Sequence, residues 1–240
     1  MIHEERTYRL LVNKGNLVSY QVKIEQSDLF ISSDTNLFSH AEHSLQQHRF
    51  FLENYIRRHP KFQTSLLPVP KDDTAPPIVR NMIDKSRFCG VGPMAAVAGA
   101  VAEYVGCDLL KFSENCIIEN GGDIFLHSKN RLIVSVYAGE STLSYKVNLI
   151  VKPEDTPLGI CTSSATVGPS LSFGKADAVC VISQSATLAD AAASAIGNRV
   201  KSKSDIRKAL KFGMTIPDIK GIIIILGPEM GAIGDIELTR

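Results

Sequence analysis

Four short segments of this 240-residue sequence place glycine, hydroxyl or carboxylate groups where a ligand could bind. The first, residues 89–93, reads Cys-Gly-Val-Gly-Pro and precedes a run of small apolar residues that predicts a buried helix. Glycine lets a ligand approach the backbone closely, and the free N–H groups of a helix N-terminus favour an anion. Gly92 and Pro93 are therefore candidate ligand-binding residues. The alternative is that the glycines only allow a tight turn before the helix.

The second segment, residues 119–123, reads Glu-Asn-Gly-Gly-Asp between two β-rich runs. Its polar groups could face a bound cofactor, and the candidate residues are Asn120, Gly121, Gly122 and Asp123. The paired glycines are also typical of a hairpin turn, which needs no further function. In that alternative Asp123 stabilises the turn.

The third segment, residues 159–164, ends in Thr162, Ser163 and Ser164. We expect it to be the end of a strand that opens into a hydroxyl-rich loop. Hydroxyl groups and loop amides could hold a phosphate or a ribose. The alternative is an ordinary polar loop.

The fourth segment contains Asp190 and Ser194, four positions apart in a run that predicts a helix. Side chains at this spacing lie one above the other on the same helix face. Hard oxygen ligands suit Mg²⁺, which proteins often hold by one or two of their own oxygens plus substrate phosphates. Two alternatives remain. Thr187 and Asp190 have the spacing of a capping box, or the pair lies on a solvated face.

Cys89 suggests a different chemistry, because it lies a few residues before the expected helix start at Pro93. The dipole and free N–H groups of a helix N-terminus stabilise a thiolate, so Cys89 could be a catalytic thiol that handles sulfur or persulfide. The alternative is a small buried hydrophobe, which is our expectation for Cys107, Cys116 and Cys180. The five cysteines form no Cys-x-x-Cys pair, which indicates free thiols in a reducing compartment.

The elements that must position these segments are short strands mixed with a few helices. Residues 7–12 and 17–24 predict a hairpin around the turn-forming cluster 13–16, and residues 28–32 predict a third strand. Apolar residues at helical spacing predict a helix over 39–58 that ends before Pro60. The other expected strands are 116–119, 123–127, 131–137, 145–151, 176–182, 221–226 and 235–239, and the other expected helices start at Pro93 and cover 187–200 and 205–211.

Strands that follow one another through short connections outnumber regular βαβ units in this pattern. The sequence therefore predicts an α+β fold with mostly antiparallel sheets and with flanking and buried helices. A chain of 240 residues can form one large domain or two intimate lobes. Four prolines within residues 66–77 predict an irregular segment that crosses between such lobes.

Composition argues against several classes of protein. The 26 basic and 25 acidic residues give a net charge of +1, with no basic run of five, which disfavours a nucleic-acid binder. The N-terminus is polar, and the longest aliphatic run, residues 222–226, is far shorter than the roughly 20 residues that span a bilayer. We therefore expect a soluble, cytoplasmic protein with a small-molecule ligand and no membrane or nucleic-acid partner. A homo-oligomer is compatible with these features.

Three segments, in this order, resemble an uncharacterised protein family of archaea and bacteria. They are Ala-Pro-Pro-Ile-Val-Arg at 75–80, Gly-Val-Gly-Pro-Met-Ala-Ala-Val-Ala-Gly at 90–99 and Glu-Asn-Gly-Gly-Asp-Ile at 119–124. The resemblance runs from residue 7 or so to the C-terminus. That family is distantly similar to the ApbE superfamily, the FAD:protein FMN transferases once called thiamine biosynthesis lipoproteins. The resemblance implies an ApbE-like fold with a site for a flavin or a nucleotide.

Individual segments are similar to ApbE motifs. Residues 121–124 look like the Gly-Gly-Asp-Ile turn, and Thr162 with Ser163 looks like the Thr-Ser-Gly loop. Residues 189–194 look like the Ala-Asp-Ala-x-x-Thr helix, whose Asp and hydroxyl bind Mg²⁺ in that family. The resemblance thus implies Mg²⁺ at Asp190 and Ser194, with FAD or FMN as the cofactor and a backbone carbonyl from the Gly92–Pro93 loop. In such enzymes the metal assists attack of a protein threonine on the FAD pyrophosphate, which releases AMP.

The sequence departs from ApbE proteins at two motifs. The His-Pro-x-Thr-Gly motif is missing, and residues 167–175 take its place. The Gly-Gly-x-Ala-Lys-Gly segment has become residues 92–97, without its lysine. The resemblance therefore implies the ApbE-like fold but not the transferase activity. The alternatives to that activity are a non-catalytic flavin- or nucleotide-binding protein and a protein that uses the thiol chemistry of Cys89.

Overall fold

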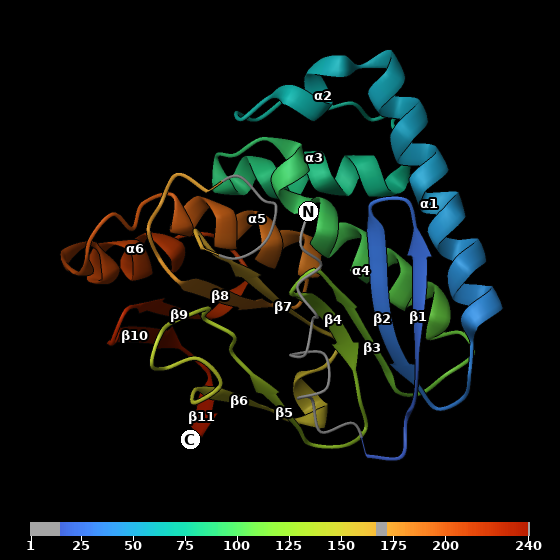
Figure 1. The fold of residues 1–240 in the computed structure, drawn as a ribbon. Coiled ribbons are helices and arrows are strands. Elements are labelled where there is room, and N and C mark those ends of the chain that lie inside the picture. Colours follow the sequence, from blue (N-terminus) through green and yellow to red (C-terminus); the bar gives the residue numbers. More distant parts are fainter. Residues whose placement is uncertain (1–14, 167–171, 240) are drawn as a thin grey trace.

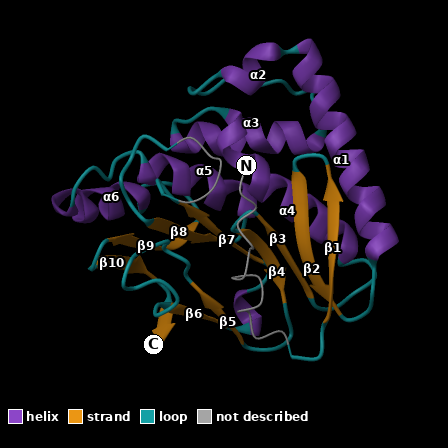
Figure 2. Ribbon diagram, in the orientation of Figure 1, coloured by secondary structure: helices purple, strands orange, loops and turns teal. Residues whose placement is uncertain are grey.

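The computed structural model describes residues 15–166 and 172–239. A large sheet lies between a layer of helices and a second, smaller sheet (Figure 1). Neighbouring strands in the described part of both sheets pair antiparallel. Figure 2 shows the helices gathered on one side of the large sheet. These features confirm the predicted α+β class with mostly antiparallel sheets.

The large sheet has eight strands and the small sheet has three. In spatial order the large sheet consists of β1 (Val18–Ile24), β2 (Ser27–Ser33), β3 (Cys116–Asn120), β4 (Asp123–His127), β7 (Leu158–Ser163), β8 (Ala178–Ser183), β9 (Ile219–Leu226) and β10 (Glu229–Gly234). The small sheet consists of β11 (Glu237–Thr239), β6 (Asn148–Val151) and β5 (Leu132–Ser135).

Apart from the short η3, the described helices form an inner and an outer layer on one face of the large sheet (Figure 1). The helices are α1 (Phe38–Arg58), α2 (Pro60–Thr64), α3 (Pro77–Cys89), η2 (Pro93–Ala96), α4 (Val97–Leu109), η3 (Pro153–Asp155), α5 (Ala186–Gly197), η4 (Lys203–Asp205) and α6 (Ile206–Gly213). Helix α4 packs on β3 and β4, and α5 packs on β7 and β8. Helix α3 lies outside both, in contact with α1, α4 and α5.

Several predicted elements are present as expected. The strands 17–24 and 28–32 form the β1–β2 hairpin, and the helix 39–58 is α1. The strand expected at 7–12 lies outside the described residues. The strand expected at 123–127 is β4.

Other predictions were incomplete or wrong. The sequence analysis did not predict helix α3, because the prolines before it disfavour regular structure. Pro77 nevertheless occupies the first helical turn, where proline is tolerated. The run 235–239 contains the short strand β11, which pairs with β6 of the small sheet. The partner of β9 is β10, which carries two glycines and is mostly exposed, so it has little of the pattern that marks a strand.

The central strands separate two apolar cores. Successive side chains of a strand point to opposite faces. Accordingly Ile222 and Ile224 pack in the core below the helices, whereas Ile223 and Ile225 pack in the core that faces the small sheet. A strand buried on both faces reads as a continuous aliphatic run, which accounts for residues 222–226.

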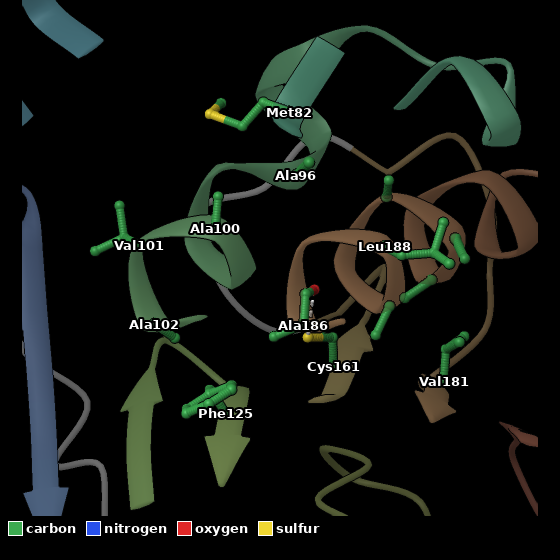
Figure 3. Close-up of a cluster of buried hydrophobic side chains, with 14 of the residues drawn as sticks. Met82, Ala96, Ala100, Val101, Ala102, Phe125, Cys161, Val181, Ala186 and Leu188 are labelled. Carbon is green, nitrogen blue, oxygen red and sulfur yellow. Dashed lines mark hydrogen bonds between the residues drawn. The ribbon is translucent and has the colours of Figure 1, made fainter. Parts of the chain in front are cut away.

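Small residues let the inner helices approach one another and the sheet. Figure 3 shows Ala100 and Ala102 of α4 beside Ala186 and Leu188 of α5, with Phe125 of β4 beneath α4. Each of these side chains is at most 2% exposed. No single helix in the described part of the chain is long and apolar enough to span a membrane, and α3 with the Pro93–Leu109 segment meets that criterion only as a pair bent by 103°.

Candidate functional site

The candidate site is built around the contact between α4 and α5. A Cβ atom on Gly99 would lie 2.3 Å from the carbonyl oxygen of Ala186 and 2.8 Å from Cβ of Asp190. Only glycine therefore allows this approach of the two helices. Gly99 near the start of α4 contacts Asp190, and Glu103 one turn later contacts the start of α5. The two helices consequently run antiparallel at this point.

Asp190 binds the N-terminus of α4. One carboxylate oxygen, Oδ2, accepts a hydrogen bond of 2.9 Å from the backbone N–H of Gly99, and the carboxylate also accepts from the N–H of Ala98. These N–H groups belong to the first turn of α4, where the helix supplies no partner for them. Asp190 is thus a cap for α4, which is a different role from the capping-box alternative at the start of its own helix. The N-cap of α5 is Ser185, whose side chain accepts from Leu188.

Glu103 makes the reciprocal contact from α4 to the start of α5. Its carboxylate oxygen Oε2 accepts hydrogen bonds from Ser185 Oγ at 2.9 Å, from the Thr187 N–H at 2.8 Å and from Thr187 Oγ1 at 3.0 Å. Each helix therefore supplies a carboxylate to the N-terminus of the other. Negative charge is favourable at both places because of the helix dipole.

Asp123 brings a second carboxyl group to the Asp190 side of this contact. It is the first residue of β4. Ile124 pairs with Ile160 in the antiparallel ladder, so the preceding residue, Asp123, lies opposite Cys161. The Asp123 carboxyl interacts with the Cys161 side chain and accepts a hydrogen bond from the Thr162 N–H, and its own side chain is buried. Burial and the nearby charge of Asp190 raise the pKa of Asp123 well above its ordinary value.

The two carboxyl groups disfavour one another's ionisation. Burial raises the pKa of Asp190 to about 7, although the N–H groups of Gly99 and Ala98 act in the opposite direction. Two buried carboxylates at one site resist carrying two negative charges unless a cation joins them. No group of three or more His, Cys, Asp or Glu side chains within residues 15–166 and 172–239 is arranged to hold a metal ion. Asp190 and Asp123 supply carboxylate oxygens, so a cation bound beside them would need further ligands from a bound molecule.

The Gly-Gly hairpin lies against the same end of α4. Gly121 and Gly122 have φ values of +67° and +103°, which non-glycine residues rarely adopt, and the Gly122 N–H donates to the Glu119 carboxylate at 2.8 Å. Asn120 donates from Nδ2 to the Ala98 carbonyl at 3.0 Å. The turn from Asn120 to Asp123 is thus a hairpin, as its glycines suggest, and it also borders the carboxyl pair.

The hydroxyl-rich segment is mostly strand rather than loop. Thr162 and Ser163 belong to β7 and pair with β8, and only Ser164 follows the strand. Pairing with β8 holds Thr162 and Ser163 in place. A Cβ on Gly197 would lie 3.6 Å from Ser163 Oγ, so β7 runs beneath α5 along much of its length. Ser194 is partly buried on α5, one turn beyond Asp190.

The Gly92–Pro93 segment packs against the chain that follows α2. The Gly92 N–H donates to the Leu66 carbonyl at 3.0 Å, and a Cβ on Gly92 would lie 1.8 Å from the Ser65 carbonyl oxygen. The Gly92 carbonyl accepts from the Ala95 N–H at 3.1 Å. Gly92 is therefore required for this close approach. Asp190 instead accepts from the backbone N–H groups of Ala98 and Gly99, six and seven residues after Gly92. The geometry therefore gives no support to the metal-binding carbonyl that was expected from the Gly92–Pro93 loop.

Cys89 does not have the environment that a reactive thiolate needs. It is the last residue of α3, so it lies at a helix C-terminus, and it is 2% exposed. Burial and the charge of Asp190 raise the pKa of the Cys89 thiol to about 12. The physical basis for a catalytic thiol is therefore absent. The expectation for Cys107 was also wrong, because this residue is exposed.

Two residues of the site were not singled out as ligands or positioning groups from the sequence. Glu103 follows six small or apolar residues at the start of α4, and a carboxylate in such a place must find buried donors. Cys161 of β7 is the second such residue, and its sulfur points toward Ala186 and donates to that carbonyl at 3.3 Å (Figure 3). The usable signal for Glu103 was a charge that follows a run of small and apolar residues.

Comparisons with known proteins agree with this architecture. A family model described as AbpE bacteria matches residues 9–233. The UPF0280 protein of Methanocaldococcus jannaschii is 40% identical over 227 residues, which cover 92% of this chain and 92% of the relative. The UPF0280 protein of Methanocella arvoryzae is 43% identical over 188 residues, which cover 76% and 75% of the two chains.

Solved structures share the fold at low sequence identity. The apo form of the flavinyl transferase ApbE from Pseudomonas stutzeri has a TM-score of 0.57 at 13% identity and covers 90% of this chain and 93% of that one. The ApbE protein of Thermotoga maritima has a TM-score of 0.53 at 12% identity, with coverage of 90% and 96%. At such identities the likeness concerns the fold alone. The match of the family model over most of the sequence and the two relatives show that this chain belongs to the AbpE bacteria family, with the UPF0280 proteins among its relatives and an ApbE-like fold.

Proposed function

We propose that this protein binds a flavin or adenine nucleotide together with Mg²⁺ at Asp190, and that it transfers FMN from FAD to an acceptor. The observation that carries the proposal is the carboxyl pair of Asp123 and Asp190 at the N-terminus of α4. A cation bound beside these two carboxyl groups would favour their ionised forms, which burial disfavours. The fold shared with solved structures of flavin transferases adds support.

The chain's own groups would divide the work as follows. Asp190 and Ser194 would hold the cation through a carboxylate oxygen and a hydroxyl oxygen on one face of α5. Asp190 retains lone pairs for this, because a carboxylate offers about four acceptor positions and two N–H groups use only part of them. Phosphate oxygens of the nucleotide would complete the coordination, as is usual for Mg²⁺.

The remaining groups would orient the ligand. The Asn120–Asp123 turn would border the nucleotide, and Thr162 and Ser163 would line it from β7. When bound, Mg²⁺ would withdraw negative charge from a pyrophosphate and so favour its cleavage. A non-catalytic nucleotide-binding protein is the alternative. The sulfur-handling alternative is not favoured, because Cys89 is buried at a helix C-terminus.

Isothermal calorimetry with ADP or FAD, with and without Mg²⁺, tests the binding. We expect binding that depends on Mg²⁺ in the wild type and a loss of at least tenfold in affinity in Asp190→Ala, on the order expected for removing a metal ligand. Equal nucleotide binding by both proteins, regardless of Mg²⁺, would leave Asp190 only as a helix cap. AMP release from FAD in the presence of an acceptor protein then separates a transferase from a nucleotide-binding protein.

A further inference from the structure

Glu103 lies outside every segment that the sequence suggested as a ligand site, yet it makes three hydrogen bonds to α5. Its donors are Ser185 Oγ at 2.9 Å, Thr187 N at 2.8 Å and Thr187 Oγ1 at 3.0 Å. Ser185 is the N-cap of α5 and Thr187 lies in its first turn. Glu103 therefore fixes the beginning of the helix that carries Asp190.

The hydrogen bonds of Asp190 lie one turn further along the same helix pair. Asp190 follows Thr187 by three residues and accepts from the Gly99 N–H, which precedes Glu103 by four. An α-helix rises about 1.5 Å per residue. A slip of α5 along α4 by a single residue would therefore break the contacts of Glu103 and Asp190 together.

Packing restricts this register at Gly99, where an added Cβ would meet Ala186 and Asp190. The other packed residues shown, such as Ala100 and Ala186, are small and lack the bulk to interlock. Packing on β7 and β8 positions α5 on the sheet, and packing on β3 and β4 positions α4. The carboxylate bonds of Glu103 and Asp190 are the directional contacts between the two helices.

Thr187 extends the arrangement to a third helix. Its hydroxyl donates to Glu103 and accepts a hydrogen bond of 3.1 Å from Asn81 Nδ2 of α3. Glu103, Thr187 and Asn81 thus connect α4, α5 and α3 through side chains that are partly or fully buried. The connection lies on the side of α5 where the helix begins, away from Ser194.

We propose that Glu103 is a positioning residue for the Asp190 site: it holds the α5 register that places the Asp190 carboxylate at the N-terminus of α4. The inference rests on the proposed function only for its effect on ligand binding. Its structural part, the dependence of the Asp190–Gly99 hydrogen bond on Glu103, can be measured without any ligand.

The test compares wild type, Glu103→Ala, Glu103→Gln and Asp34→Ala. Asp34 is a matched control, because its carboxylate also accepts a hydroxyl and backbone N–H groups, from Ser113, Glu114 and Asn115, at another part of the chain. Two quantities are measured well below each melting temperature: hydrogen exchange of the Gly99 amide, and the affinity for ADP in the presence of Mg²⁺.

In Glu103→Ala we expect faster exchange of the Gly99 amide and roughly tenfold weaker Mg²⁺-dependent binding of ADP, as for other residues that orient a metal ligand. Glu103→Gln should restore most of both, since its amide oxygen can accept the same bonds. Asp34→Ala should leave the Gly99 exchange and the ADP affinity unchanged, even if its melting temperature falls as far as that of Glu103→Ala. Unchanged Gly99 exchange in Glu103→Ala, or equal effects in Asp34→Ala, would overturn the inference. If wild type binds no ADP with Mg²⁺ while Gly99 exchange still responds to Glu103→Ala, the proposed function fails and the positioning role stands.

Discussion

At the scale of single residues, the notable feature is a pair of acids whose ionisation the fold opposes. Most surface carboxyl groups of this chain with a shifted pKa, such as Asp34 and Asp205, have it lowered by hydrogen bonds. Asp123 and Asp190 have it raised, chiefly by burial. Groups shifted in this direction by desolvation and by one another are typical of functional sites.

The first prediction concerns the pH dependence of stability in the metal-free protein. The pKa of Asp190 is about 7 in the folded protein and lower in the unfolded chain. At pH values between these two pKa values the folded state binds more protons than the unfolded state. The free energy of unfolding should therefore rise as the pH falls through this range. With a discount for partial exposure, we expect a gain on the order of 2 kcal/mol from about pH 8 to about pH 5. Denaturant unfolding at both values measures it.

The control is Asp190→Asn, in which the side chain cannot titrate. Most of the gain should disappear in this variant, and what remains belongs to the other acids. An Asp190→Asn protein that gains as much stability as the wild type on acidification would show that Asp190 ionises normally in the fold.

The second prediction concerns the thiols. Burial raises the pKa of the Cys89 thiol to about 12, and Cys89 is 2% exposed, whereas Cys107 is exposed. Access should therefore decide the rate, and a limiting alkylating reagent at neutral pH should label Cys107 first. Peptide mass spectrometry reads the order of labelling. Faster labelling of Cys89 would restore the case for thiol chemistry.

At the scale of elements, the contact of α4 with α5 depends on one glycine. The third prediction is that Gly99→Ala lowers the free energy of unfolding by about 1–3 kcal/mol, the usual range for an inserted group that the backbone must move to admit. The cause is the 2.3 Å approach of its Cβ to the Ala186 carbonyl oxygen. Thermal or denaturant unfolding gives the value.

Gly197→Ala is the matched control on the same helix pair. Its added Cβ would meet its nearest atoms at 3.6 Å or more, which is ordinary contact, so the change should stay within about 0.5 kcal/mol. Similar losses in both variants would indicate that α4 and α5 are held by something other than their close approach at Gly99.

Sequence reasoning recovered the elements whose apolar pattern is strong and local. The helix α1 has a clear apolar period of 3.6, and β4 is a short apolar run. The candidate segments lie at turns, at a strand end and within α5. Helix α3 was lost because proline was read as a breaker, although Ile78, Val79 and Met82 repeat at helical spacing. That omission placed Cys89 before a helix start instead of at a helix end.

The site itself was only partly within reach of the sequence. Asp190 and Asp123 stand in recognisable motifs, but their contact depends on the register of β4 against β7, which no local pattern specifies. The partners of Glu103 are 82 and more residues away in the chain. Long-range capping of this kind follows from tertiary packing, and the only trace of it in the sequence is a charge after a run of small and apolar residues.

At the scale of the whole molecule, two apolar cores share the strands β8 and β9. The expectation of a single domain, or of two intimate lobes joined near residues 66–77, remains a prediction. The fourth prediction tests it: Ile222→Ala in the core below the helices and Ile223→Ala in the core facing the small sheet should each cost about 2–5 kcal/mol. Both should lower the midpoint of one common transition.

Calorimetry together with far-ultraviolet and tyrosine near-ultraviolet circular dichroism measures that transition. Coincident curves in both variants would indicate one cooperative unit, because neighbouring side chains of the same strand serve both cores. A separate early transition in Ile223→Ala alone would show that the small sheet and its core unfold independently.

The exchange of carboxylates between α4 and α5 also has a consequence for how the chain folds as the ribosome makes it. Residues 97–109 are synthesised long before residues 186–197, so during that interval the first turn of α4 has no Asp190 and Glu103 has no Thr187. Helix α4 is thus translated with an uncapped end and an unmatched charge. Its final position waits until some four-fifths of the polypeptide has been made, and the carboxyl pair is among the last features of the protein to form.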